Sequence, residues 1–111
     1  MRIVQALIEK YAGSEVHDRL LVLEEDWTHP AVIQAFTKYK EWVDKGFFPD
    51  GFLTALPGET QLLVYAGEAA MDIQGPWYET NIIRDGQDIN NYGFFPMPLT
   101  DGANRMSAFI V

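Results

Sequence analysis

The chain has 111 residues with 48% hydrophobic and 22% charged side chains, which excludes a disordered or fibrous protein and predicts a folded domain. Its length allows one small domain with a single core and excludes two full lobes around a ligand. The net charge of −8 would repel a polyanion, so we expect no nucleic acid among the partners. Because the chain contains no cysteine, disulfides, thiolate metal sites and thiol nucleophiles are excluded as well.

Targeting segments are not evident in the sequence. No apolar run approaches the roughly 20 residues that a membrane-spanning helix needs. Residues 1–5 lack the layout of a secretory signal. We therefore expect no membrane span and no signal sequence in the chain, and if the full protein is secreted, this sequence should begin inside it.

The first predicted element is a helix over residues 3–12, where apolar side chains recur at helical spacing. Gly13 follows it and suits the left-handed backbone conformation found just beyond a helix end. Residues 14–26 mix short apolar runs with acidic side chains and show no clear period. A loop with one short strand is expected there.

A stronger helical pattern covers residues 30–45, with apolar side chains along one face and charged ones along the other. Thr28 or His29 is expected to cap this helix, and Pro30 fits its first turn, where a missing N–H costs nothing. Gly46 is expected to end it. The apolar face, which includes Phe36, should lie on the core.

The next elements are shorter. A helix is predicted over residues 59–66, closed by Gly67, and a strand over residues 69–73, where apolar and polar side chains alternate. Pro76 then fits the first turn of a helix that should run to Arg84. These elements place a strand directly before a helix.

The last part of the chain predicts two further strands, over residues 92–95 and 107–111, after a loop at residues 87–91. Helices that alternate with short strands are typical of an α/β fold, with the helices packed on a small sheet. The apolar end of the chain, residues 108–111, would need a neighbouring strand, so we expect self-association there by strand pairing or exchange.

The motifs of several enzyme classes are missing. The chain has no Gly-x-Ser-x-Gly elbow, no phosphate-binding glycine loop and no His-Glu-x-x-His pair. His17 and His29 are far apart, and we expect them to be solvated or capping residues, not metal ligands. The acidic residues 24–26 lack the spacing of a calcium loop. We expect no enzyme, no metal site and no cofactor.

The most informative stretch is residues 65–77, which predicts a helix, a strand and a second helix that starts at Trp77. In open α/β sheets ligands bind beyond the carboxyl ends of strands, and a flat indole suits the C–H face of a pyranose. The alternative is that Trp77 is a core anchor, which periodicity alone favours. Trp42 is expected to be such an anchor, and Trp27 to pack against the start of the following helix.

Three blocks of the sequence resemble the family of bacterial extracellular solute-binding proteins that includes maltose-binding protein. The blocks are Gly67-Glu68-Ala69-Ala70-Met71, Ile73-x-Gly75-Pro76-Trp77 and Tyr92-Gly93-Phe94-Phe95-Pro96-Met97-Pro98. The resemblance implies that residues 1–98 are part of the C-terminal lobe of a periplasmic-binding-protein-like fold. Residues 99–111 would then be the hinge crossing and the first strand that returns toward the missing N-terminal lobe.

The same resemblance implies a function. Members capture a carbohydrate outside the cell, here expected to be an oligosaccharide, and deliver it to the permease subunits of an ABC importer. The parent protein would be extracellular or periplasmic, either free or lipid-anchored. Trp77 falls where a tryptophan of sugar-binding members stacks on the ligand, and Gly75 and Pro76 form the turn that presents it. Tyr78 and Glu79 occupy neighbouring positions that vary with the ligand, so all five are expected ligand-binding residues.

Two other functions stay open. One is a non-catalytic structural or interaction domain with no small ligand, in which Trp77 is buried. The other is a small carbohydrate-active enzyme that uses acidic residues, although no spacing singles out a carboxylate pair.

Overall fold

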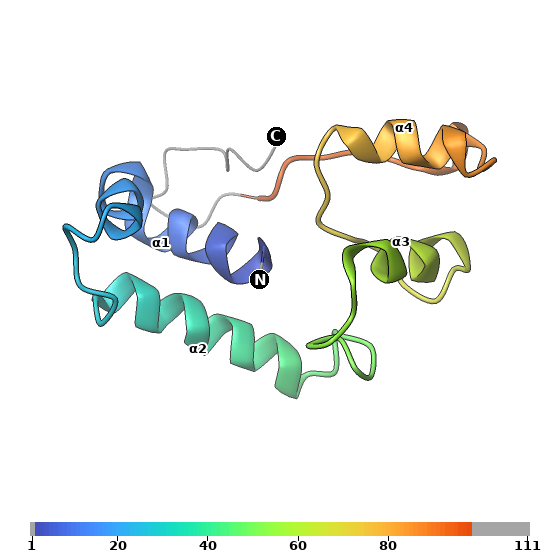
Figure 1. Cartoon of the computed structure of the whole chain (residues 1–111). Coiled ribbons are helices and arrows are strands. Elements are labelled where there is room, and N and C mark those ends of the chain that lie inside the picture. The colour runs from blue at the N-terminus through green and yellow to red at the C-terminus, as the bar shows by residue number, and fades with distance from the viewer. Residues whose placement is uncertain (1, 99–111) are drawn as a thin grey trace.

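The computed structural model describes residues 2–98 of the chain. Helices α1 and α2 lie side by side at one end of the molecule, and α3 and α4 lie at the other (Figure 1). The segment after the last short helix runs back from α4 toward α1. The elements are α1 (Arg2–Leu21), α2 (Pro30–Asp44), α3 (Pro57–Tyr65), α4 (Trp77–Arg84) and the 3-10 helix η1 (Ile89–Asn91).

The predicted α/β fold is wrong for residues 2–98, because this part of the chain contains helices and no strand. The segments expected as strands at residues 69–73 and 92–95 are irregular and pair with no neighbour. A strand exists only where another strand lies within about 5 Å to accept and donate its backbone hydrogen bonds. The expected lobe, with helices packed on a small sheet, is therefore not found. The hinge crossing at residues 99–111 and the terminal strand lie outside the described residues.

Helix α1 is longer than predicted and bends at Gly13, which has φ 74° and ψ 172° in an otherwise helical run. The prediction that the first helical segment stops at Gly13 is confirmed. The loop and short strand predicted for residues 14–26 are wrong, because the chain returns to helix directly after the bend and stays helical to Leu21. This bend lets both halves of α1 contribute to one core.

That core joins α1 to α2. Side chains from both halves of α1 pack with the inner face of α2, and Trp42 and Met97 pack against them from the side, as expected for Trp42. The buried members are Val4, Leu7, Ile8, Leu20, Val32 and Ala35.

A second, smaller cluster holds the other end of the molecule. The rings of Tyr65 on α3 and Tyr78 on α4 are stacked, with centroids 6.2 Å apart and planes 2° from parallel. Tyr92, just after η1, meets Tyr65 edge-on at 6.0 Å. Ile82 of α4 is fully buried. Three tyrosines thus connect α3, α4 and the returning segment.

The helix ends follow the sequence closely. His29 caps α2, since its Nδ1 accepts a hydrogen bond of 3.1 Å from the N–H of Ala31. Gly46 ends α2 with φ 71°, and the N–H of Phe47 donates to the carbonyl of Trp42 at 3.1 Å. This is the Schellman arrangement, which satisfies carbonyls left open at a helix end. The predicted ends of α3 at Gly67 and of α4 at Arg84 are confirmed, and both helices end with the same bonds.

Helix α1 ends with the same bonds but without glycine. The N–H of Glu24 donates to the carbonyl of Arg19 at 2.9 Å, and Leu23 takes the left-handed position with φ 61°. Among the described residues, Leu23 is the one non-glycine residue with positive φ. Its backbone conformation is therefore strained, because Cβ crowds the carbonyl oxygen.

Leu23→Gly is expected to raise the free energy of unfolding by about 0.5–1 kcal/mol. The left-handed conformation costs roughly 1–2 kcal/mol for a residue with Cβ, and glycine relieves this strain. The greater entropy of glycine in the unfolded chain offsets about half of that gain. Urea unfolding followed by circular dichroism measures the change. The matched control is Leu21→Gly at the last residue of α1, whose φ is not positive, so this change should lower stability instead of raising it. Equal effects of the two changes would contradict the strain at Leu23.

Candidate functional site

The predicted ligand corner exists as a turn into a helix, but no strand enters it. Residues 71–75 are irregular, Pro76 has φ −58° and ψ −25°, and α4 begins at Trp77. The N–H of Tyr78 donates to the carbonyl of Gly75 at 3.0 Å, which closes the turn. The corner thus depends on proline and on one backbone hydrogen bond.

The Trp77 indole lies against Gly75. A Cβ atom added to Gly75 would overlap the six-membered ring, so the indole can take this position only beside a residue without a side chain. Trp77 remains 38% exposed, which places it neither in the core nor fully in solvent. The structure therefore brings Gly75 and the Trp77 indole together.

Arg2 stands over the same ring. Its Cζ lies 5.1 Å from the ring centroid, a cation–π distance, and its Nη1 donates a hydrogen bond of 3.0 Å to Gln74 Oε1. The Gln74 amide donates in turn to Asp72 Oδ2 at 2.6 Å, and the Thr60 hydroxyl donates to the same oxygen at 2.9 Å. A chain of polar side chains therefore runs from the indole to α3.

The Trp77 indole and the polar side chains near it offer two kinds of contact to a ligand. The indole is 38% exposed, with Gly75 against its six-membered ring and the Arg2 guanidinium over the ring, so a pyranose that stacks on the covered face must displace that guanidinium. Arg2 and Gln74 carry N–H donors, and the carboxylate of Asp72 lies further along. A pyranose has an apolar C–H face and a rim of hydroxyls, which require those two kinds of partner. The arrangement suits stacking with edge hydrogen bonds, and it offers no nucleophile paired with a base.

The other predicted ligand residues lie differently. Tyr78 is buried against Tyr65, and burial raises the pKa of its phenol to about 12. Its hydroxyl makes no hydrogen bond to another described residue. Pro76 and Glu79 are exposed, with Glu79 in the first turn of α4. Tyr78 thus acts as a packing residue of the small cluster.

Two participants were not found from the sequence. Arg2 is separated from Gln74 by 72 positions, so no local pattern could connect them. Gln74 sits inside the block Ile73-x-Gly75, where the resemblance leaves the residue type open. Asp72 accepts both of the hydrogen bonds described above and so connects Gln74 to α3.

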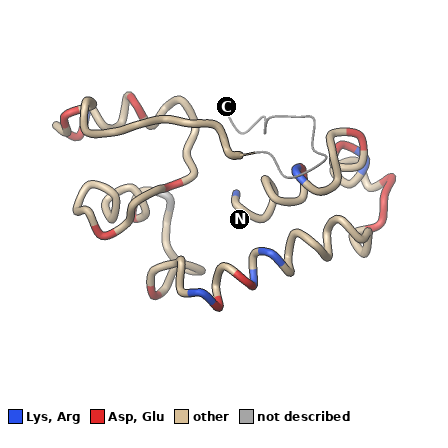
Figure 2. The backbone as a smooth tube through the Cα atoms, turned by 180° about the vertical axis from the view of Figure 1, so that it is seen from behind, with Lys and Arg blue, Asp and Glu red and all other residues tan. Residues whose placement is uncertain are grey.

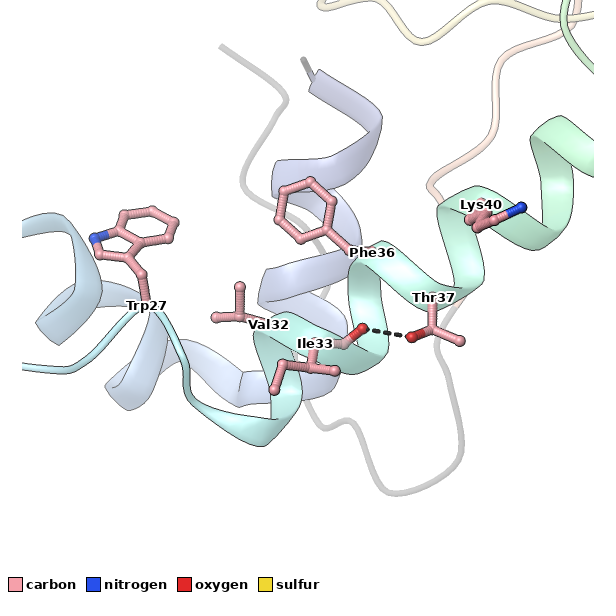
Figure 3. A pocket seen from close by; sticks show the side chains of 6 residues that line it. All are labelled: Trp27, Val32, Ile33, Phe36, Thr37 and Lys40. Carbon is pink, nitrogen blue, oxygen red and sulfur yellow. Dashed lines mark hydrogen bonds between the residues drawn. The ribbon is translucent and has the colours of Figure 1, made fainter.

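A second surface feature lies on α2, far from these residues in sequence. It is an open hollow of about 420 Å³ beside the start of the helix, and we call it the α2 groove (Figure 3). Phe36, expected on the core face of the helix, lies in this groove and is exposed, because Ala35 and Val32 fill the contact with α1. The groove is lined by Trp27, Val32, Ile33, Phe36, Thr37 and Lys40.

Another hollow, of about 190 Å³, lies between α1 and α2 and is lined in part by Met97 and Pro98. Neither of these two hollows includes Trp77. His17, expected to be solvated or capping, is buried in α1 with Nδ1 3.5 Å from Asp18 Oδ1.

Metal centres and membrane-spanning helices are not found among residues 2–98. No group of three or more histidine, aspartate or glutamate side chains there is placed to hold a metal ion. None of the helices in this range combines the length and apolar character required to cross a bilayer.

The Arg2–Trp77 contact is expected to shift the side-chain proton resonances of Arg2 upfield, because protons above an aromatic ring lie in its ring current. Trp77→Leu should return these resonances to ordinary arginine positions, while Trp27→Leu should leave them unchanged. Two-dimensional NMR of the three proteins measures the effect. Ordinary Arg2 shifts in the unsubstituted chain would contradict the contact.

Comparison of the chain with protein-family models, with curated proteins and with solved structures finds no match. The assignment of a function therefore depends on the Trp77 corner and on the sequence blocks that surround it.

Proposed function

We propose that the chain is part of an extracellular solute-binding protein of an ABC importer, in which Trp77 contacts an oligosaccharide for delivery to the permease subunits. The protein would act without catalysis, outside the cell or in the periplasm, free or lipid-anchored. The observation that carries the proposal is the half-exposed Trp77 indole beside a chain of polar side chains. The helical fold of residues 2–98 does not contribute to it, because it lacks the sheet on which such a lobe is built.

The site should bind weakly. Tight carbohydrate or small-molecule sites bury about 70–90% of the ligand surface, whereas Trp77 lies outside both hollows described above. One aromatic contact contributes on the order of 1 kcal/mol, and a few exposed hydrogen bonds add about as much each. A total near 4 kcal/mol corresponds to a dissociation constant of about 1 mM.

The test is a titration of the chain with malto- and xylo-oligosaccharides, followed through the indole N–H signals in a ¹H–¹⁵N NMR spectrum. The chain has 3 tryptophans, so each contributes its own signal and Trp77→Phe identifies the one that matters. We expect that signal to shift saturably at millimolar sugar while those of Trp27 and Trp42 stay in place. No shift at about 20 times the expected dissociation constant would reject the proposal.

The enzyme alternative makes a separate prediction. A carbohydrate-active enzyme would release reducing ends from the same oligosaccharides, and we expect none after prolonged incubation. The interaction-domain alternative is favoured by one observation, the exposed apolar lining of the α2 groove.

A further inference from the structure

Helix α2 carries apolar side chains on two faces. The inner face carries Ala31, Val32 and Ala35, which are buried, and Val32 and Ala35 pack in the core with α1. The outer face carries Ile33 and Phe36, which are 58% and 46% exposed, and Trp27 from the preceding turn is 49% exposed beside them. Figure 3 shows these side chains around the start of α2, with Phe36 and Ile33 projecting from different sides of the ribbon. A helix that is apolar on two faces is typical of one that contacts more than its own chain.

The size of the α2 groove limits the kind of contact. Aromatic side chains bury about 150–250 Å² each, so the half-exposed Trp27 and Phe36 together with Ile33 offer roughly 300 Å². The stems of Thr37 and Lys40 add about 100 Å². Two such surfaces together would bury about 800 Å², below the roughly 1,200 Å² of a stable standard interface. A partner of this surface alone would therefore bind reversibly and weakly.

The charged residues at the two ends of the α2 groove indicate what kind of partner could bind there. The acidic residues 24–26 lie immediately before Trp27 at one end of the α2 groove, and Lys40 lies at the other end. Figure 2 shows these acidic residues at the junction of α1 and α2, and lysines further along α2. Lys40 is paired only with Asp44 among the interactions described, in a pair whose two side chains are 73% and 60% exposed, and such pairs contribute little. Lys40 can therefore exchange that partner at small cost.

Opposite charges at the two ends make the groove complementary to itself. If two copies place their α2 helices antiparallel about a two-fold axis near Phe36, Lys40 of each copy approaches the acidic residues of the other. A parallel arrangement would bring acidic residues against acidic residues. The same two-fold axis places the Ile33 and Phe36 side chains of both copies in one apolar contact.

We propose that the α2 groove is the contact surface of a weak two-fold dimer of this chain, with the two α2 helices antiparallel. The dimer forms through the apolar side chains Trp27, Ile33 and Phe36, and the charges at its ends determine the relative direction of the helices. It is independent of the oligosaccharide proposal, since Trp77 lies outside the groove.

The first test is sedimentation equilibrium of the full chain from about 10 µM to 1 mM, a range that covers weak interfaces of this size. We expect a reversible monomer–dimer equilibrium, and Ile33→Glu should weaken it at least tenfold by placing a charge in the apolar contact. The matched control is Leu53→Glu, an exposed leucine between α2 and α3 outside the groove, which should leave the equilibrium unchanged. Circular dichroism confirms that each variant keeps its helices. A monomer at all concentrations, or equal effects of the two variants, overturns the proposal.

The second test addresses direction. Lys40→Glu and Glu24→Lys should each weaken the dimer, and the double variant should restore it, because the exchanged charges again face each other across the interface. Failure of the double variant to recover rejects the antiparallel arrangement.

A third variant distinguishes the α2 groove from the chain terminus, for which the sequence predicts strand pairing. Ile110→Asp should leave the dimer intact. If Ile110→Asp abolishes self-association and Ile33→Glu does not, the terminal strand is the contact and the groove proposal is wrong.

Discussion

Gly75→Ala is expected to displace the Trp77 indole and to reduce oligosaccharide affinity about tenfold. The new Cβ would occupy the space of the six-membered ring, so the indole must rotate away from Gly75 and from the guanidinium of Arg2. A tenfold loss of affinity corresponds to about 1.4 kcal/mol of binding free energy, which is about the contribution of one aromatic contact. The indole N–H signal of Trp77 should move even without sugar, and the sugar titration should then require about ten times more ligand.

The matched control for this change is Gly93→Ala. A Cβ at Gly93 meets no atom within 4 Å, so the same substitution should leave the Trp77 signal and the titration unchanged. An unaltered Trp77 signal in Gly75→Ala would show that the indole does not lie on Gly75. If Gly75→Ala alters the Trp77 signal but leaves the sugar affinity unchanged, the indole lies on Gly75 as described but does not contact the sugar.

Leu7→Ala is expected to lower the free energy of unfolding by about 2–5 kcal/mol. Leu7 is 2% exposed in the core between α1 and α2, and large-to-small changes in a core cost both the transfer of the lost atoms and the cavity that remains. The total free energy of unfolding of a domain of this size is about 5–15 kcal/mol, so the variant should be partly unfolded near 40 °C. Urea unfolding followed by circular dichroism gives the difference.

The control for the core is Leu53→Ala, which removes the same atoms from an exposed side chain. It should change stability by less than about 0.5 kcal/mol. A small effect of Leu7→Ala, comparable with that of the control, would contradict the packing of α1 on α2. The indole signal of Trp42 reports on the same core, because Trp42 packs against it.

Features that depend on neighbouring residues were predicted well. Helices α2, α3 and α4 begin and end within two residues of their expected limits, and His29 caps α2 as one of two expected candidates. A helix end depends on backbone angles and hydrogen bonds within about one turn, which is why Gly46 is informative without any tertiary contact. The turn into α4 at Pro76 follows for the same reason.

Features that depend on distant residues were not predicted. Alternation over residues 69–73 indicated a strand, but a strand needs a partner segment and this one has none among residues 2–98. The helical period of α2 is equally compatible with several inner faces, so Phe36 was expected inside and lies outside. The continuation of α1 beyond Gly13 depends on Leu20, whose burial against the α1–α2 core stabilises the second half of that helix.

The sequence by itself determined the ends of α2, α3 and α4, the absence of thiol chemistry and the presence of Trp77 at the first residue of a helix. Each of these is set by residue type or by bonds within a single turn. Only the tertiary structure decided that Tyr78 packs inside, that Arg2 covers the indole and that α2 leaves an apolar groove exposed. These depend on side chains brought together from segments up to 75 positions apart, as Arg2 and Trp77 are, and packing between such segments has no local signature.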